Sequence, residues 1–302
     1  MPAEFGRLIT AMVTPMREDG SVDYDRAVDL AKGLAASGSD GLVVAGSTGE
    51  GITLTAEEKI ELWAAVRSGL PADIAVIAGS SNSSTAESIT LSREAERVGC
   101  DGLLFTVPAY NKPTQEGLIR HFTAIADATS LPAMLYNIPA RSALNMTAET
   151  TLRLAQHPKI VGVKEASADL AQIGRVIAGA PAGFRVWSGN DSDTLAVMAM
   201  GGYGVVSVAA HLVGRQIRAM IDACVSGSIA AASALHHQLT PLVDVLFIES
   251  NPIPVKYALG VAGFEAGSPR LPLLPASDAA AACIRAEMAR HTIDLPVAVR
   301  AR

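Results

Sequence analysis

Short runs of apolar, β-favouring residues alternate along the chain with longer segments of amphipathic helical pattern. Eight such runs occur, at residues 8–13, 41–45, 75–78, 102–107, 133–136, 160–164, 185–188 and 204–208. Most of them are apolar almost without interruption, which is typical of parallel strands covered on both faces. The alternation therefore predicts repeated βα units that build a parallel sheet.

The spacing of the runs decides between a closed and an open sheet. Eight strands separated by helices within about 225 residues match a closed (β/α)8 TIM barrel better than an open doubly wound sheet. Thr55 and Thr114 precede two of the helical segments and are predicted N-caps. After the eighth run only helices are predicted, at residues 214–227, 229–247, 254–262 and 277–290. We therefore predict a catalytic barrel over residues 1–226 and a C-terminal helical extension over residues 227–302.

The composition excludes several classes of protein. The 302 residues are 49% hydrophobic and 18% charged, which excludes general disorder. The net charge of -6 comes without any Lys/Arg block, so nucleic acid and anionic membranes are not expected partners. No apolar run approaches the roughly 18 residues that span a bilayer. The N-terminus lacks the pattern of a secretory signal, and we predict a cytoplasmic protein.

Cysteines and histidines give no indication of a metal site. Cys100, Cys224 and Cys283 are far apart and odd in number, which predicts reduced, separately buried thiols. The histidines lack paired-ligand spacing and are interpreted as surface or core residues; they include His121, His157, His211, His236 and His237. We predict no metal.

Two residues at neighbouring strand ends are candidates for carbonyl chemistry, because barrels of this kind place the active site at the C-terminal ends of their strands. Lys164 would emerge from an apolar wall, where burial lowers the pKa of the amine and makes it a nucleophile. The alternative is a solvated lysine or an ion pair with Glu165. Tyr136 could relay protons beside it. Its alternative role is to plug the barrel top.

Three further segments could bind substrate. Ser47 and Thr48 lie on a glycine-flanked loop, where hydroxyls can pass protons and backbone N–H groups can hold a carboxylate. A hydroxyl-rich turn is the alternative, and no phosphate-loop pattern is present. Arg141 could clamp a carboxylate or form a surface salt bridge. Gly189 and the two residues after it could line the mouth, although capping the next helix is the favoured interpretation.

Together these segments resemble the dihydrodipicolinate synthase and N-acetylneuraminate lyase superfamily over nearly the whole chain. The resemblance rests on the order and spacing of residues 46–50 (GSTGE), 136–139 (YNIP), 162–165 (GVKE) and 204–208 (GVVSV). Three features resemble the synthase branch, namely residues 110–113 (YNKP), Arg141 and residues 251–256 (NPIPVK). The sialic acid lyases lack that arginine.

The resemblance implies a class I lyase without a cofactor that condenses pyruvate with L-aspartate 4-semialdehyde, in lysine and diaminopimelate biosynthesis. It implies that Lys164 forms the pyruvate imine and that Tyr136 is the central acid and base. Ser47 and Tyr110 would complete a proton relay. Tyr110 would come from a neighbouring subunit of a homotetramer built as a dimer of tight dimers.

The resemblance also implies how the two substrates are held. Thr48 would bind the pyruvate carboxylate, partly through its backbone N–H, and Val206 would contribute its carbonyl oxygen. Arg141 would hold the carboxylate of aspartate semialdehyde. The alternatives are a Schiff-base lyase or aldolase acting on N-acetylneuraminate or a 2-keto-3-deoxy sugar acid, and a non-catalytic barrel that binds pyruvate.

Two positions depart from the synthase pattern. Ser47 stands where synthases usually carry threonine and the lyases carry serine, and Ala109 stands where many synthases carry a second tyrosine. In lysine-sensitive relatives an amide, a carboxylate, a histidine and an aromatic ring surround the inhibitor. Here only the carboxylate clearly remains, as Glu87, whereas Ser83, Lys59 and Ala109 occupy the other positions, with Asn82 one place early. The sequence therefore predicts weak inhibition by L-lysine.

Overall fold

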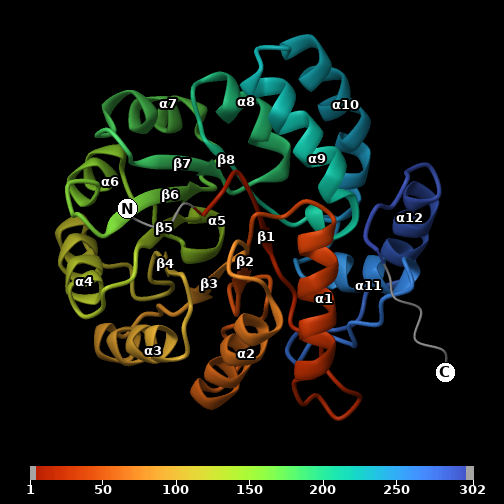
Figure 1. The fold of residues 1–302 in the computed structure, drawn as a ribbon, viewed down its shortest axis with the longest axis horizontal. Coiled ribbons are helices and arrows are strands. Elements are labelled where there is room, and N and C mark those ends of the chain that lie inside the picture. The colour runs from red at the N-terminus through yellow and green to blue at the C-terminus, as the bar shows by residue number, and fades with distance from the viewer. Residues whose placement is uncertain (1–4, 297–302) are drawn as a thin grey trace.

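The computed structural model describes residues 5–296, in which eight parallel strands close into a barrel. The strands follow one another around the ring in chain order, with helices outside them (Figure 1). They are β1 (Leu8–Ala11), β2 (Gly41–Val44), β3 (Ala75–Gly79), β4 (Gly102–Thr106), β5 (Ala133–Asn137), β6 (Ile160–Glu165), β7 (Arg185–Ser188) and β8 (Gly204–Ser207). Pairing of β8 with β1 closes the ring. The predicted (β/α)8 TIM barrel is confirmed.

Each strand begins at its predicted residue, and the differences lie at the C-terminal ends. β1 ends at Ala11, two residues before the end of the predicted run. The reason is that the N–H of Val13 donates to Nε2 of His211 at 3.1 Å instead of to a neighbouring strand. His211 is a fully buried core histidine, and burial lowers its pKa to about 4.

Most helices around the barrel begin at a polar N-cap residue whose side chain accepts a hydrogen bond from a backbone N–H of the first turn. They are α1 (Tyr24–Ala36), α2 (Ala56–Gly69), α3 (Thr85–Arg97), α4 (Gln115–Asp127), α5 (Pro139–Ser142), α6 (Ala148–Leu154), α7 (Leu170–Gly179), the 3-10 turn η1 (Asp191–Asp193), α8 (Thr194–Ala199) and α9 (Ala210–Val225). Both predicted N-caps are confirmed. Thr55 forms a capping box with Glu58, and Thr114 accepts from the N–H of Gly117.

Two apolar layers hold the barrel together. The outer layer fills the space between strands and helices and includes Trp63 and Phe122, both fully buried. The inner layer fills the barrel itself and includes Trp187, Tyr136 and Val206. Because side chains fill the interior of the barrel, a substrate cannot enter it. The active site of such a barrel lies above the inner layer, at the C-terminal ends of the strands.

Three helices follow the barrel: α10 (Ile229–Val245), α11 (Ile253–Val261) and α12 (Asp278–Met288). In Figure 1, α11 and α12 lie to one side of the barrel. The predicted helical extension is therefore confirmed, while its boundary at residue 227 stays a prediction. The preceding helix was predicted to start at residue 214. In the structure α9 begins with a short turn at Ala210, where Ser207 Oγ accepts from the N–H of Ala210, and a kink at the non-helical Val213 separates this turn from the continuous helix that starts at the predicted residue.

The three cysteines are free, but only Cys100 is fully buried. Cys224 is half-buried and Cys283 is exposed, so the prediction of three buried thiols was wrong for these two residues. Cys283 lies on α12, whose neighbouring Ala281 and Ile284 face the protein and turn it outward. Within residues 5–296 no helix has both the length and the apolar character that crossing a membrane requires.

Candidate active site

Lys164 and Glu165 end β6 with their side chains on opposite sides of the barrel wall. Lys164 is 5% exposed and points inward, where burial lowers the pKa of its amine to about 7. Asp191 opposes that shift and Arg141 adds to it. Glu165 points outward and accepts from Asn137 Nδ2 at 3.0 Å. The alternative interpretations of Lys164 as solvated or paired with Glu165 were therefore wrong.

Tyr136 stands beside Lys164 because the two residues are directly opposite each other in the β5–β6 register. Nζ of Lys164 is 4.1 Å from the centroid of the tyrosine ring. Burial raises the pKa of the phenol, so the hydroxyl keeps its proton at neutral pH. The tyrosine is part of the inner layer, and its ring lies next to the amine, where the predicted proton relay requires it.

The loop after β2 presents Ser47 and Thr48 at the same end of the barrel. Ser47 is half-buried, and its carbonyl accepts from the N–H of Glu50 at 3.2 Å. Thr48 is 4% exposed, and its hydroxyl accepts from Asn251 Nδ2 at 2.9 Å. Gly51 has to be glycine, because a Cβ there would lie 2.0 Å from the carbonyl oxygen of Ala45. The close packing of this loop fixes the positions of its hydroxyls.

Arg141 lies on α5, directly after β5. Its Nη2 donates to the backbone carbonyl of Asn251 at 2.9 Å, and the rest of the side chain is exposed. Its positive charge also lowers the pKa of Tyr136. The hydrogen bond to Asn251 fixes the guanidinium group and leaves its other N–H groups available near Lys164 and Tyr136. A group that binds a carboxylate needs both properties.

Gly189 and Val206 approach the same region from β7 and β8. A Cβ on Gly189 would lie 3.1 Å from Cγ of Lys164 and 2.7 Å from Cβ of Ala166, so a larger residue would displace the lysine. Val206 is fully buried in the inner layer that also contains Tyr136. The structure thus places Gly189 next to Lys164 and Val206 in the same apolar layer as Tyr136.

Asp191 was considered only as one of three residues that could line the mouth, and no chemical role was predicted for it. Its carboxylate accepts from the N–H groups of Val208 at 2.9 Å and Ala209 at 3.2 Å, and from the hydroxyl of Ser207. The favoured interpretation was that these residues cap the next helix. Asn190 stands at the N-cap of η1 without a side-chain capping bond, whereas Asp191 binds backbone N–H groups just before α9. Its charge also raises the pKa of Lys164 against the effect of burial. An aspartate three residues after the seventh strand end was the available signal.

Tyr110 was predicted to belong to the site, but within a single chain its side chain projects into solvent. It is 96% exposed in the turn after β4 and has a φ of +73°. Ile52, on the loop after β2, is 91% exposed. Two large side chains that protrude this far are typical of surfaces that other molecules cover.

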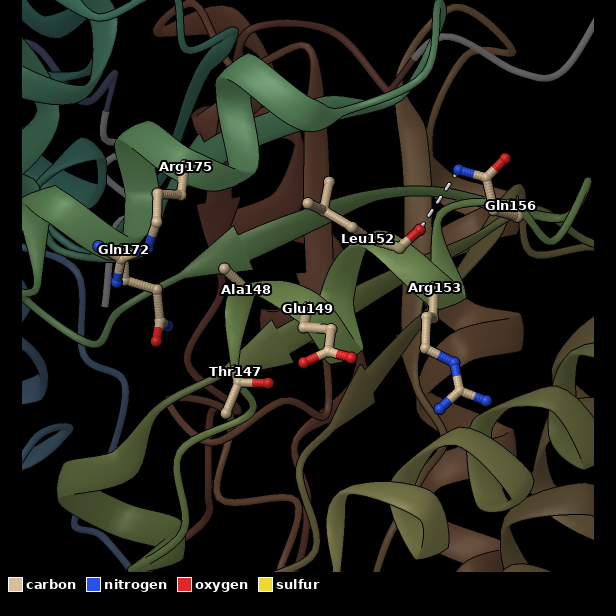
Figure 2. A pocket seen from close by; sticks show the side chains of 8 residues that line it. All are labelled: Thr147, Ala148, Glu149, Leu152, Arg153, Gln156, Gln172 and Arg175. Carbon is tan, nitrogen blue, oxygen red and sulfur yellow. Dashed lines mark hydrogen bonds between the residues drawn. The ribbon is translucent and has the colours of Figure 1, made fainter.

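A surface groove between α6 and α7 lies outside this constellation (Figure 2). Arg153 and Glu149 come from α6, and Arg175 comes from α7. Gln172 lines the groove and also donates to Glu165, which ties the outer wall of β6 to α7. The groove contains no residue that the sequence proposed for catalysis.

The pKa of Lys164 predicts the pH dependence of adduct formation. Only the neutral amine attacks a carbonyl, so the rate with pyruvate should rise about tenfold per pH unit below pH 7 and level off above it. The measurement is the initial rate of borohydride trapping between about pH 5.5 and 9. Asp191→Asn should move the midpoint downward, because it removes the charge that stabilises the ammonium. A rate that still climbs steeply above pH 9 would contradict the lowered pKa.

Comparisons with known proteins agree with this geometry. Residues 4–290 match the model of the dihydrodipicolinate synthetase family. The 4-hydroxy-tetrahydrodipicolinate synthase of Dehalococcoides mccartyi is 55% identical over 294 residues, covering 97% of this chain and 99% of the relative. The enzyme of the same name from Moorella thermoacetica is 55% identical, covering 91% and 94%. The crystal structure of the Cyanidioschyzon merolae synthase with lysine bound matches with a TM-score of 0.93 and 45% identity, covering 95% and 98%.

Proposed function

Because the chain belongs to the dihydrodipicolinate synthetase family, we propose that it uses Lys164 to form a Schiff base with pyruvate. The reaction is that of 4-hydroxy-tetrahydrodipicolinate synthase, in which pyruvate condenses with L-aspartate 4-semialdehyde on the route to diaminopimelate and lysine. No cofactor takes part in this proposal, because the imine itself supplies the electron sink. We also propose a cytoplasmic location, which suits free thiols.

The first half of the reaction makes the nucleophile. The neutral amine of Lys164 attacks the ketone carbon of pyruvate, and the resulting carbinolamine loses water to give an iminium ion. Tyr136, whose ring lies 4.1 Å from that amine, gives a proton to the departing oxygen. The iminium then accepts the electron pair left when the pyruvate methyl group loses a proton, and an enamine results.

The second half makes the carbon–carbon bond. The methylene carbon of the enamine attacks the aldehyde carbon, and the electron pair returns from the nitrogen. Two carboxylates have to be held apart while this happens, and in this proposal the Thr48 loop holds one and Arg141 holds the other. The aldehyde oxygen takes up a proton and becomes a hydroxyl group. The amino group that came with the semialdehyde then attacks the imine carbon, which closes the six-membered ring, and the amine of Lys164 leaves as the free base.

A second subunit completes the proton relay in this proposal. Tyr110 is 96% exposed, so its hydroxyl is free to enter the site of a neighbouring chain, where Ser47 and Tyr136 would take up the proton. The exposed Ile52 supports the same interface. We therefore propose a homotetramer built from tight dimers, with pyruvate and aspartate semialdehyde as the small-molecule partners.

The observation that carries the proposal is a buried amine with a pKa of about 7 beside Tyr136, in a chain 55% identical to a synthase. A coupled assay tests it by offering pyruvate first with aspartate semialdehyde and then with sugar-derived aldehydes. Turnover should require the amino-acid aldehyde. Ser47 is shared with the lyase branch, so faster turnover of the sugar-derived aldehydes would replace the synthase assignment with the aldolase alternative.

Inhibition by L-lysine is expected to be weak, because the matching cleft has lost most of its polar partners. Lys59 is 9% exposed and lies close enough to Glu87 for the two charges to interact. The Oδ1 of Asn82 already accepts from the N–H of Ser84 at 2.7 Å, and Ser83 donates to the carbonyl of Ala109 at 2.9 Å. The amide oxygen of Asn82 and the hydroxyl proton of Ser83 are therefore already engaged within the protein.

The expected loss of affinity for lysine exceeds tenfold, because a missing ring contact costs about 0.5 to 2 kcal/mol and the Lys59 cation repels the ligand ammonium. Activity measured against lysine from micromolar to tens of millimolar decides the matter, with calorimetry alongside. Lys59→His combined with Ala109→Tyr should increase inhibition. Half-maximal inhibition of the unaltered enzyme below about 1 mM would contradict the prediction.

A further inference from the structure

Asn251, from the segment between α10 and α11, contacts both residues proposed to bind the substrate carboxylates. Its side-chain Nδ2 donates to the hydroxyl of Thr48 at 2.9 Å, and its backbone carbonyl accepts from Nη2 of Arg141 at 2.9 Å. Asn251 itself is only 7% exposed. One residue of the helical extension therefore lies between the pyruvate side and the aldehyde side of the mouth.

The same loop is attached to the extension a second time. The carboxylate of Glu50, two residues after Thr48, lies 2.5 Å from Nζ of Lys256 on α11, and both side chains are almost completely buried. The backbone N–H of Arg270 donates to the other oxygen of Glu50 at 2.7 Å. A buried ion pair with this support keeps the loop in one place, so the geometry around Thr48 is rigid enough for a single hydrogen bond to set its direction.

The direction of the bond to Thr48 has a chemical consequence. A hydroxyl group has one proton to donate and two lone pairs to accept with. Because Asn251 donates, it occupies a lone pair and leaves the Thr48 proton for another acceptor. At the mouth of the barrel, the carboxylate proposed to bind next to Thr48 is that acceptor.

We propose that Asn251 is a positioning residue, whose side-chain amide turns the Thr48 hydroxyl so that it donates to the carboxylate of pyruvate. This inference rests on the proposed function, because it needs pyruvate at the Thr48 loop. The backbone link to Arg141 does not depend on the side chain. Changes to the side chain should therefore affect pyruvate and leave the aldehyde largely unaffected.

Two substitutions separate this role from a purely structural one. Asn251→Ala removes the donor and should raise the half-saturating pyruvate concentration about fivefold to tenfold, as expected for one lost hydrogen bond. Asn251→Asp keeps the shape but can only accept, so Thr48 would donate to it and lose its proton for the substrate. Its negative charge also repels the pyruvate carboxylate. Asn251→Asp should therefore raise the half-saturating pyruvate concentration more than Asn251→Ala does, by about fiftyfold or more relative to the unaltered enzyme.

The readout is borohydride trapping of the Lys164 adduct as a function of pyruvate concentration, with the KM of aspartate semialdehyde measured in parallel. Ser277→Ala is the matched control, because it removes one capping hydrogen bond from α12 in the same extension. It should leave the pyruvate dependence unchanged. In Asn251→Ala and Ser277→Ala, which add no charge, the aldehyde KM should stay within about twofold, since the Arg141 anchor is a backbone group.

A double-mutant cycle keeps the proposal testable if Asn251→Ala lowers stability. In the Thr48→Val background no hydroxyl remains to be turned. Asn251→Ala should then leave the half-saturating pyruvate concentration almost unchanged, and Asn251→Asp should raise it only by the effect of its charge. Equal effects of the two Asn251 substitutions, or a parallel rise in the aldehyde KM of Asn251→Ala, would overturn the inference. An unaltered enzyme that forms no pyruvate adduct would instead overturn the proposed function.

Discussion

Lys164→Ala is expected to lose the pyruvate-dependent activity by about a thousandfold or more, because no other group can form the imine. The fold should survive, since the alanine keeps the strand and the inner layer still contains Tyr136 and Trp187. Steady-state kinetics at saturating concentrations of both substrates measure the loss.

Lys164→Met is the matched variant for that experiment. It preserves most of the length and apolar contacts of the lysine stem but has no amine. It should be as inactive as Lys164→Ala while unfolding at a temperature similar to that of the unaltered enzyme. Appreciable turnover in either variant would contradict covalent catalysis through Lys164.

Arg141→Ala is expected to raise the KM of aspartate semialdehyde by about tenfold to a hundredfold, with a much smaller effect on the KM of pyruvate. The reason is that a charge-assisted hydrogen bond contributes about 1.5 to 3 kcal/mol, and the guanidinium can offer two to a carboxylate. Steady-state kinetics with each substrate varied in turn provide the test.

Arg141→Lys separates charge from shape in the same experiment. Lysine keeps the positive charge but not the planar fork, so its aldehyde KM should lie between those of the unaltered enzyme and Arg141→Ala. An equal rise in both KM values, or no change with the aldehyde, would weaken the synthase assignment and favour the sugar-acid aldolase.

The sequence predicted the barrel well because strand position and burial are local properties. All eight strands begin at the predicted residue, since a buried parallel strand is an uninterrupted apolar run that starts where a polar loop ends. The short turn of α9 before the kink at Val213 was less predictable. It is held through Ser207 and Asp191, and that contact forms only when β7 and β8 lie side by side.

The site was predictable to the extent that each residue lies at the end of a strand or in the loop that follows it. Lys164, Tyr136 and Thr48 met this condition, because the closed barrel brings strand ends together whatever the intervening sequence. Asn251 did not meet it. It lies in a segment more than 40 residues after the last strand, and only the folded chain places it between Thr48 and Arg141. Its role depends on the direction of one hydrogen bond, which no sequence pattern records.

The most direct test of the account is to treat the enzyme with pyruvate and borohydride and to map the modified residue by mass spectrometry. The lowered pKa of Lys164 and its position beside Tyr136 predict one reduced pyruvate adduct per chain, located on Lys164. Adduct formation should be absent without pyruvate and absent in Lys164→Met. An unmodified Lys164, or an adduct on another lysine in an active enzyme, would contradict the Schiff-base mechanism.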